Sequence, residues 1–239
     1  MISGRQGIAN LPGICSALGM HHVVISPGSR NAPLIAAFAD YKEITIHSCT
    51  DERSAAFFGL GIAQQLQKPV GIICTSGTAV LNFAPAIAEA YYQHIPLIVF
   101  TADRPPEWID QGDGQTMRQK NIYGNYIKKS MELPVETLSE ADLRFIQREV
   151  SGLINYACTA PYGPVHVNVP LREPLYNEIP ARDKFSVSIP KIGGTPVLTE
   201  TAMNEFKLKF QVAGRIFIIC GFMPKKTVSF GAKPIIFAI

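Results

Sequence analysis

Short β-branched runs alternate with longer stretches of helical periodicity, and this alternation constrains the fold more than any other feature of the chain. It predicts strands at residues 22–25, 44–47, 69–74, 96–100 and 164–169. It predicts helices at residues 8–18, 33–39, 54–66, 79–91 and 138–157. Because the strands are continuously apolar and alternate with helices, the pattern indicates an α/β fold, a parallel sheet with helices on both faces.

The texture of the chain changes after the last of these strands. Residues 170–196 carry many prolines and charges with little periodicity, which is typical of an interdomain linker. We expect a first domain at residues 1–180, a linker at 181–197, and the start of a second α/β domain at 198–239. A helix to about residue 212 and a strand at 215–220 would begin that domain. It is expected to be incomplete, because the residues after the strand are too few to close a core.

Composition narrows the class of protein. Apolar residues make up 47% of the chain and charged residues 17%, which suits a buried core rather than disorder. A net charge of +3 without recurring Lys/Arg blocks argues against nucleic acid as a partner. No basic segment precedes a long apolar run, and no stretch reaches the roughly 20 apolar residues of a membrane span. We therefore expect a cytoplasmic protein.

The cysteines are scattered along the chain. They form no Cys-x-x-Cys pair and no zinc-type spacing: Cys15, Cys49, Cys74, Cys158 and Cys220. We interpret them as small core residues in a reducing compartment. The sequence predicts no metal-binding residue in this chain.

Polar residues follow four of the predicted strands. They lie in the segments 26–30, 51–53, 75–78 and 103–104. In an open parallel sheet, ligands gather at the carboxyl ends of the strands, so four polar loops at one edge predict one site.

Each loop, taken alone, also has a structural explanation. Gly28 and Ser29 could form a turn and a helix cap, and Ser76 could cap the helix that follows it. Asp51 and Glu52 could simply favour the positive end of a helix dipole. The coincidence of all four loops at one edge favours a functional site.

Five separated motifs resemble, in order and spacing, the N-terminal domain of a known enzyme family. They are Ser26-Pro-Gly-Ser-Arg30, Asp51-Glu-Arg-Ser-Ala-Ala-Phe57, Thr75-Ser-Gly-Thr-Ala79, Thr101-Ala-Asp-Arg-Pro-Pro-Glu107 and Gln115-Thr-Met-Arg-Gln119. The family is MenD, the thiamine-diphosphate-dependent 2-succinyl-5-enolpyruvyl-6-hydroxy-3-cyclohexene-1-carboxylate synthases of menaquinone biosynthesis. The resemblance runs to about Glu178. It implies the pyrimidine-binding domain, the first of three, and the opening of the central domain.

The resemblance implies roles for individual residues. Glu52 would be the catalytic acid that hydrogen-bonds the cofactor's aminopyrimidine ring and favours the imino form of its amine. The cofactor-binding residues would be Glu52, Pro27, Gly28, Ser76, Gly77 and Thr78. The substrate-binding residues would be Ser29, Arg30, Arg104 and Gln115, since a planar guanidinium matches a carboxylate. Arg118 is a weaker candidate, and for Arg53 and Arg118 we favour surface salt bridges.

The resemblance also implies a reaction and partners. The family decarboxylates 2-oxoglutarate and adds the succinyl carbanion to isochorismate, with thiamine diphosphate and Mg²⁺ as cofactors. The diphosphate and the metal would be held by an acidic segment of a third domain, which this sequence lacks. In this superfamily the cofactor lies between subunits, which implies a homodimer or homotetramer. We expect this chain by itself to be inactive.

Alternatives remain open at this point. Acetolactate synthases or decarboxylases, which also use thiamine diphosphate, would keep a glutamate at position 52. A noncatalytic nucleotide-binding α/β domain is disfavoured, because no Gly-x-Gly-x-x-Gly follows a strand. A noncatalytic binding or regulatory domain that has lost the chemistry is disfavoured by the joint presence of Glu52, Arg30 and Arg104.

Other polar residues are assigned no catalytic role. Ser76 lacks the Gly-x-Ser-x-Gly context of a hydrolase nucleophile. His47, His94 and His166 lie in or beside predicted strands, where core or partner-bonded histidines are common.

Phe57 and Phe58 are expected to lower the polarity around Glu52.

Overall fold

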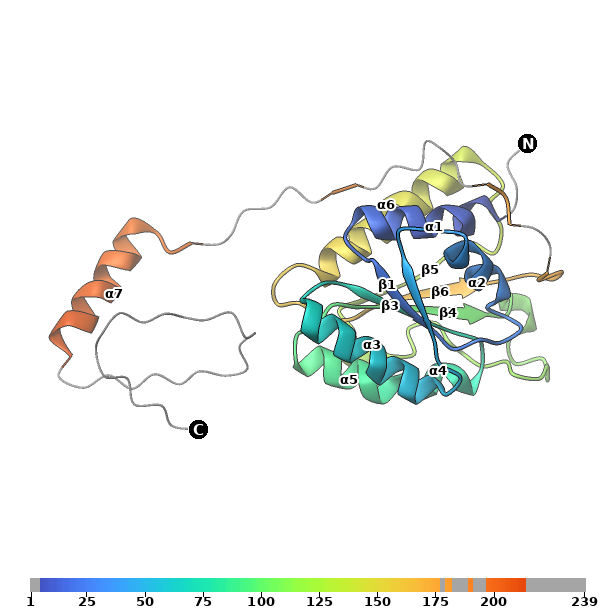
Figure 1. Cartoon of the computed structure of the whole chain (residues 1–239), viewed down its shortest axis with the longest axis horizontal. Helices are drawn as coiled ribbons and strands as arrows, with labels where there is room; N and C mark the ends of the chain where they lie inside the picture. The colour runs from blue at the N-terminus through green and yellow to red at the C-terminus, as the bar shows by residue number, and fades with distance from the viewer. Residues whose placement is uncertain (1–4, 177–178, 182–188, 191–196, 214–239) are drawn as a thin grey trace. The chain divides into compact units, whose positions relative to one another are not determined.

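The computed structural model describes residues 5–176, 179–181, 189–190 and 197–213 (Figure 1). The chain divides into two compact units, Met1–Lys191 and Ile192–Ile239. The predicted strand at 215–220 and Cys220 lie outside the described residues.

The first unit is built on a sheet of six parallel strands. In chain order they are β1 (His22–Ile25), β2 (Thr45–Ser48), β3 (Val70–Cys74), β4 (Leu97–Asp103), β5 (Lys129–Glu132) and β6 (Val165–Pro170). Their spatial order is β2-β1-β3-β4-β6-β5. The predicted α/β fold with a parallel sheet is therefore confirmed.

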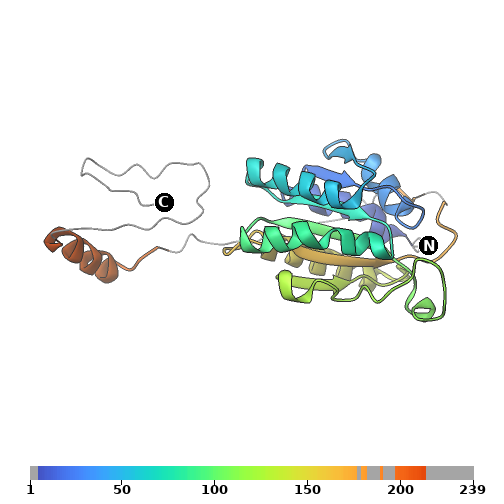
Figure 2. The ribbon, with the colours of Figure 1, turned by 90° about the horizontal axis from the view of Figure 1, so that it is seen from below.

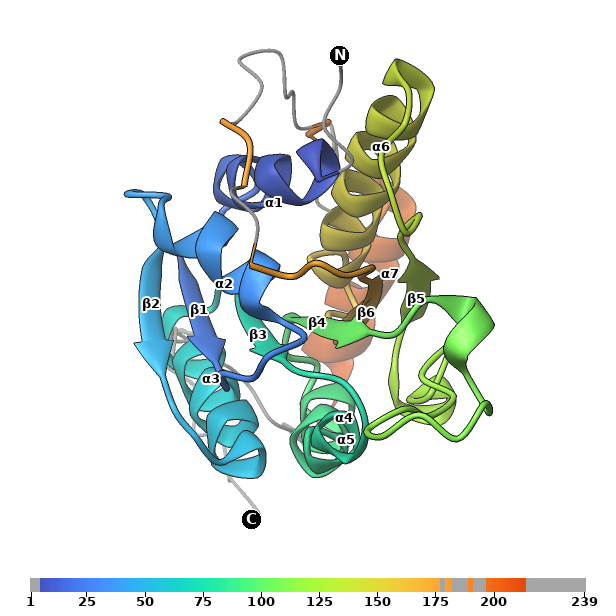
Figure 3. The same ribbon diagram turned by 90° about the vertical axis from the view of Figure 1, so that its right-hand side faces the viewer.

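Helices cover both faces of this sheet, as Figure 3 shows with the strands seen nearly end on. One face carries α1 (Gln6–Ala17), α2 (Ala32–Ala39) and α6 (Glu140–Ala157). The opposite face carries α3 (Glu52–Leu66), α4 (Thr78–Asn82) and α5 (Ala84–Tyr92), and α3 and α5 run side by side in Figure 2. Two 3-10 turns, η1 (Pro106–Trp108) and η2 (Gly124–Tyr126), lie in the long connection between β4 and β5.

Alternating side chains of the strands pack into two separate hydrophobic cores, one on each face of the sheet. Val23 and Ile25 of β1 pack in the layer under α1, α2 and α6, whereas Val24 packs in the layer under α3 and α5. Phe100 meets Phe38 in the first layer, with ring centroids 5.7 Å apart. Burying each such side chain contributes about 1.5–3 kcal/mol, so burial on both faces explains why these strands are continuously apolar.

Two helices, α6 and α3, begin at a residue whose side chain caps the first turn. Ser139 caps α6 in a capping box, in which its side chain accepts from the Asp142 amide and Asp142 accepts from the Ser139 amide. Asp51 caps α3, and its Oδ1 accepts from the Ser54 amide at 2.7 Å. This cap makes Glu52 the first residue of the helix, two residues earlier than predicted.

The single helix predicted at 79–91 is wrong in one respect, because the structure divides it into α4 and α5 at Phe83. Pro85 explains the break. It has no amide hydrogen for the carbonyl of Leu81, and its ring would clash with that carbonyl in a continuous helix.

Two strand predictions also differ from the structure. β4 continues to Asp103, so the polar residues Thr101 and Asp103 lie within the sheet rather than in a loop. β5 was missed, since Lys129-Ser-Met-Glu132 is short, mostly polar and only partly buried. It pairs with β6 at the edge of the sheet, where a strand needs few apolar residues.

In the second unit the described residues form one helix, α7 (Glu200–Val212), as predicted for residues 198–212. Thr199 caps it, and its Oγ1 accepts from the Ala202 amide at 3.3 Å. Among the helices that the structure describes, none combines the length and the apolar character needed to cross a membrane.

Candidate functional site

The strand order reverses between β1 and β3, and this reversal creates a crevice. The chain leaves β1 for α2 on one face of the sheet and leaves β3 for α4 on the other, so the two loops part at the carboxyl edge. The loops still touch at their bases. A Cβ added to Gly28 would lie 2.6 Å from the Cβ of Thr75, so this close approach requires glycine.

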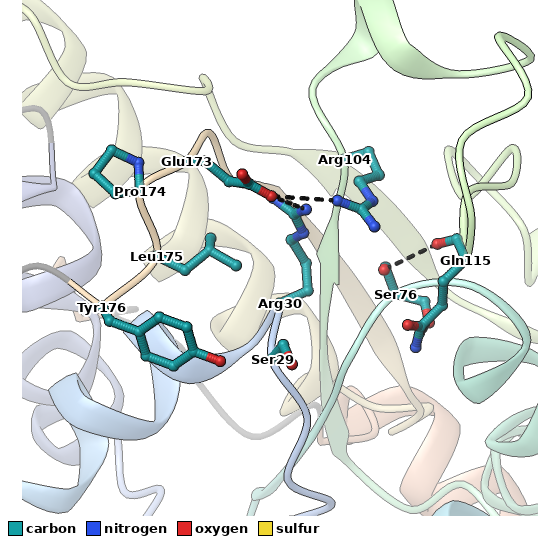
Figure 4. Close-up of a pocket in the computed structure, with 9 residues that line it drawn as sticks. All are labelled: Ser29, Arg30, Ser76, Arg104, Gln115, Glu173, Pro174, Leu175 and Tyr176. Atoms are coloured by element: carbon teal, nitrogen blue, oxygen red, sulfur yellow. Dashed lines mark hydrogen bonds and ion pairs between the residues drawn. The ribbon is translucent and has the colours of Figure 1, made fainter.

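A cavity of about 460 Å³ opens beside this crevice, within the roughly 300–1,000 Å³ range of small-molecule sites. It brings together five of the predicted site residues: Ser29, Arg30, Ser76, Arg104 and Gln115. Figure 4 shows them converging from three separate loops. The remaining lining residues, which the sequence reasoning missed, are Glu173, Pro174, Leu175 and Tyr176.

The two arginines of the cavity are held by different partners. Arg30 is buried, and it donates through Nη1 to the Leu171 carbonyl and through Nη2 to Oε1 of Glu173, each at 3.0 Å. Arg104 donates through Nη2 to the Gly114 carbonyl at 2.9 Å, and its Nη1 lies 3.6 Å from the same Glu173 oxygen. The Nε of Arg104 is buried without a hydrogen-bond partner among the described residues.

Trp108 lies against both guanidinium groups. Its ring centroid is 5.9 Å from Cζ of Arg30 and 5.8 Å from Cζ of Arg104, within cation–π range. The sequence reasoning missed this residue, although it is the single tryptophan of the chain and follows the Arg104 motif directly.

The loop after β3 is locked to the segment that carries Gln115. Ser76 Oγ donates to the Gln115 carbonyl, and Gln115 Nε2 donates to the Ser76 carbonyl, both at 3.1 Å. Gly77 lies between them with φ +76°, and its amide donates to Oε1 of the buried Gln119 at 2.9 Å. These bonds define the wall of the cavity opposite Arg30.

Replacing Gly77 by alanine is expected to lower the free energy of unfolding by about 2–3 kcal/mol, because this backbone region is open almost only to glycine. The added Cβ would also lie 2.7 Å from Cγ of Gln115. Urea unfolding measures the effect. Gly61→Ala, in the middle of α3 with nothing near the new methyl, should instead stabilise the protein slightly. Equal effects of the two substitutions would contradict this account of the loop.

Gln119 links the cavity wall to a buried polar network in the sheet. Its Nε2 donates to the Ala102 carbonyl at 3.0 Å and to Oδ1 of Asn168 at 3.1 Å. Asn168 in turn donates to Asp103 at 2.8 Å and to Glu132 at 3.0 Å. Burial raises the pKa of Asp103 to about 6, although the hydrogen bonds from Asn168 and from the Arg104 amide oppose this shift.

His166 lies at the other end of the network and is fully buried. Its Nε2 is 2.7 Å from Thr101 Oγ1, and its Nδ1 is 3.0 Å from Ser130 Oγ. Because the Thr101 hydroxyl hydrogen is directed to Asn168, His166 donates through Nε2 and accepts through Nδ1. Burial lowers the pKa of His166 to about 3. The structure thus agrees with the partner-bonded, structural role expected for this histidine.

Acid should destabilise the protein through His166. Its folded-state pKa lies below the ordinary value of about 6.5, so the unfolded chain binds more protons between about pH 3 and 6.5. Stability from this residue is therefore complete above pH 6.5 and falls, by up to about 4 kcal/mol, as the pH drops through that window. Asp103, with its raised pKa, acts in the opposite sense between about pH 4 and 6.

The difference in unfolding free energy between wild type and His166→Gln, measured from pH 4 to 8, isolates the histidine contribution. It should widen with rising pH and then level off near pH 7. The exposed His21→Gln is the control. A difference that does not change with pH would contradict a buried neutral His166.

Glu52 lies outside the cavity, at the start of α3 beyond β2. It is half-buried and forms no side-chain hydrogen bond or ion pair with the part of the chain that the structure describes. The charge of Glu52 acts on the end of β3. Burial raises the pKa of the Cys74 thiol there, and the nearby Glu52 carboxylate raises it further. The carboxylate therefore lies near the carboxyl end of β3.

The expected apolar surroundings of Glu52 are not found. Phe57 and Phe58 are 43% and 51% exposed, because residues five and six positions along a helix project away from its first residue. Ala55 and Ala56, three and four positions along, are the buried neighbours on its face of α3.

The remaining predicted residues occupy the surrounding loops. Pro27 and Gly28 lie after β1, and Thr78 begins α4. Arg118 is 82% exposed and pairs with Asp110 at 2.8 Å, as expected for a surface salt bridge. No three His, Cys, Asp or Glu side chains of the described residues are grouped as a metal site would require.

Comparison with known proteins places this geometry in a family. The sequence profile described as "Thiamine pyrophosphate enzyme, N-terminal TPP binding domain" matches residues 6–122. These residues therefore form an N-terminal domain of the thiamine pyrophosphate enzyme family. The match covers β1 to β4 and therefore both walls of the crevice.

Three curated relatives of the chain carry the name 2-succinyl-5-enolpyruvyl-6-hydroxy-3-cyclohexene-1-carboxylate synthase. The chain is 43% identical to the one from Desulfotalea psychrophila over 96% of its own length and 45% of the relative's. It is 52% identical to that of Flavobacterium psychrophilum over 73% and 30%, and 39% identical to that of Porphyromonas gingivalis over 93% and 38%. The resemblance to the MenD family is confirmed, and the chain spans less than half the length of these relatives.

Proposed function

We propose that this chain supplies the pyrimidine-binding part of a 2-succinyl-5-enolpyruvyl-6-hydroxy-3-cyclohexene-1-carboxylate synthase. The whole enzyme would decarboxylate 2-oxoglutarate and join the remaining four-carbon unit to isochorismate. The observation that carries the proposal is the combination of Glu52, a carboxylate without a hydrogen-bond or ion-pair partner among the described residues, with two cavity arginines, Arg30 and Arg104. Names of the relatives support it over an acetolactate synthase or decarboxylase.

The crevice residues fit the aminopyrimidine end of thiamine diphosphate. Glu52 is available to accept a hydrogen bond from a ring nitrogen, and the buried Ser26 Oγ lacks a partner among the described residues. Pro27, Gly28, Ser76, Gly77 and Thr78 would form the walls, and Gly28 and Gly77 let the two loops pack closely against Thr75 and Gln115. When bound, the cofactor supplies the nucleophilic carbon of the reaction.

Glu52 would hold and polarise the ring. Its negative charge would favour protonation of the ring nitrogen, and Glu52 lies in the first turn of α3, where the helix dipole favours an anion. The contribution of the chain is thus orientation and electrostatics rather than covalent chemistry.

The arginines would bind carboxylates of isochorismate, with Ser29 and Gln115 as hydrogen-bonding neighbours. Two guanidinium groups a few ångströms apart in a partly buried cavity are an arrangement that binds carboxylates of a small acid. Tyr176 and Leu175 would contact the carbon ring of the ligand from the opposite side.

Mg²⁺ and the diphosphate would be bound by another domain of the whole enzyme. Four of the cysteines, Cys15, Cys49, Cys74 and Cys158, are free thiols, which suits the reducing conditions of a cytoplasm, where we place this enzyme.

We also propose that the working enzyme is a homo-oligomer. The face formed by α3, α4 and α5 carries exposed large apolar side chains, namely Phe57, Phe58, Leu66, Leu81 and Tyr92. Sedimentation velocity should show that the wild-type protein is a dimer or tetramer and that Phe57→Arg dissociates it into monomers. Leu138→Arg, an equally drastic change before α6 on the opposite face, should leave the assembly unchanged. Monomeric wild type at tens of micromolar would contradict the proposal.

Calorimetric titration with thiamine diphosphate and Mg²⁺ tests the proposed cofactor site. We expect binding when the chain is mixed with a diphosphate-binding domain of the family and little binding by either part alone. Glu52→Gln should weaken the binding of the mixture. Tight binding of NAD or ATP instead would favour a nucleotide-binding domain and would refute the proposal.

A further inference from the structure

The arginine pair already holds a carboxylate that belongs to the chain itself. One oxygen of Glu173, Oε1, lies 3.0 Å from Nη2 of Arg30 and 3.6 Å from Nη1 of Arg104. Figure 4 shows the Glu173 side chain directed from the far rim of the cavity toward both guanidinium groups. The position is the one that a carboxylate of a ligand would take between two arginines.

The backbone around Glu173 is anchored on both sides. Before it, the Leu171 amide donates to the Asp103 carbonyl at 3.0 Å, and the Leu171 carbonyl accepts from Arg30. After it, Arg5 donates to the carbonyls of Pro174 and Leu175. These bonds hold the Cα of Glu173 at the cavity rim, so only the side chain needs to rotate for the carboxylate to enter or leave.

The three charged side chains differ in their access to water. Those of Arg30 and Arg104 are 5% and 18% exposed, whereas that of Glu173 is 56% exposed. Without a counter-ion, the two shielded cations would repel each other and lack full solvation. Glu173 can leave them at small cost to itself, because its carboxylate would pass into water.

We propose that Glu173 is a resident carboxylate, which neutralises part of the charge of Arg30 and Arg104 until a carboxylate of the ligand displaces it. This rests on the proposed function in that the ligand is taken to be a small dicarboxylate. Ligand binding is then an exchange of carboxylates at the arginine pair. Glu173 consequently weakens binding of every anionic ligand and discriminates against neutral molecules of the same shape, which cannot replace its charge.

Trp108 provides the measurement. It is the single tryptophan and lies against both arginines, so its fluorescence reports on their surroundings. The full chain would be titrated with cyclohexane-1,3-dicarboxylate, which has no absorbance at the excitation wavelength, and with the corresponding diamide. We expect Glu173→Gln to tighten dicarboxylate binding by about tenfold, with no effect on the diamide. Glu173→Asp, which retains the charge, should stay close to wild type.

A matched control is Glu136→Gln. Glu136 is a partly exposed carboxylate that pairs with Arg172, outside the cavity, and its loss should not change the titration. Thermal unfolding of each variant shows whether the fold is retained. Unchanged or weaker dicarboxylate binding by Glu173→Gln, or no binding by any variant, would overturn the proposal. If Glu173 only held the two arginines in place, its removal would weaken the binding of the dicarboxylate.

Isochorismate separates this inference from the proposed function. If Glu173→Gln tightens dicarboxylate binding while isochorismate binds to neither form, the resident carboxylate stands and the proposed substrate fails. If isochorismate binds both forms equally, the substrate stands and the displacement of Glu173 is refuted.

Discussion

Glu52→Gln is expected to lower thiamine-diphosphate-dependent turnover by roughly 10³-fold, in the range that proton-transfer catalysis contributes. Glutamine keeps the shape of the side chain and an acceptor oxygen but removes the charge that favours the protonated ring. The half-buried carboxylate of Glu52 has no hydrogen-bond or ion-pair partner among the described residues, so it is left to interact with the cofactor. The effect should therefore fall on activation of the cofactor, measured as kcat with this chain as part of the complete enzyme.

The fold should tolerate this substitution. Only the interaction of the Glu52 charge with the first turn of α3 is lost, which is worth about 0.3–1 kcal/mol. Asp51→Asn is the matched control, because Asp51 is the exposed neighbour and asparagine caps helices equally well. It should retain activity. Near-normal turnover by Glu52→Gln in a correctly folded enzyme would remove Glu52 from the catalytic role.

Arg30→Lys should weaken binding of a dicarboxylate ligand by roughly 100-fold, although the charge is kept. Arg30 uses two separate nitrogens, one on the buried Leu171 carbonyl and one on the partly exposed carboxylate of Glu173. A lysine ammonium is a single point that cannot span both acceptors, so one bond is lost and the cation moves away from Trp108.

Stability should fall in the same variant by about 1–2 kcal/mol, because the buried Leu171 carbonyl loses its charged donor. Trp108 fluorescence titration and urea unfolding measure the two effects separately. Arg118→Lys, at an exposed pair with Asp110, should change neither. If Arg30→Lys binds dicarboxylates like wild type, the guanidinium fork is not what recognises the ligand.

Much of the fold could be predicted because strand and helix signals in this chain are local. Apolar runs such as Val70–Cys74 need only their own residues to be recognised. β5 could not be predicted in this way, because its polar residues Ser130 and Glu132 are satisfied by His166 and Asn168 of β6, more than 30 residues away. The extension of β4 to Asp103 has the same cause, since Asn168 provides the partner.

The candidate site likewise contains residues that the sequence could predict and residues that it could not. Ser29, Arg30, Ser76 and Arg104 lie in loops that follow predicted strands, and parallel strands bring such loops to one edge. Gln115 and the roles of all five residues were predicted only from the resemblance to the MenD family. Glu173 lay in a stretch with the composition of a linker, and nothing near it in the sequence signals the two arginines that it meets. Gln119 lay in a recognised motif, but its part in holding Gly77 depends on contacts with β4 and β6.

The sequence by itself determined that this chain forms a parallel α/β sheet with polar loops at one edge and that its motifs are those of the MenD family. The tertiary structure alone decided the strand order, and with it the reversal between β1 and β3 at the carboxyl edge of the sheet. It also decided that the arginines face a carboxylate of their own chain. The physical reason is that hydrophobic periodicity specifies which face of an element is buried, whereas the choice of neighbour depends on contacts between distant residues, such as those of Arg30 with Leu171 and Glu173, 141 and 143 positions away.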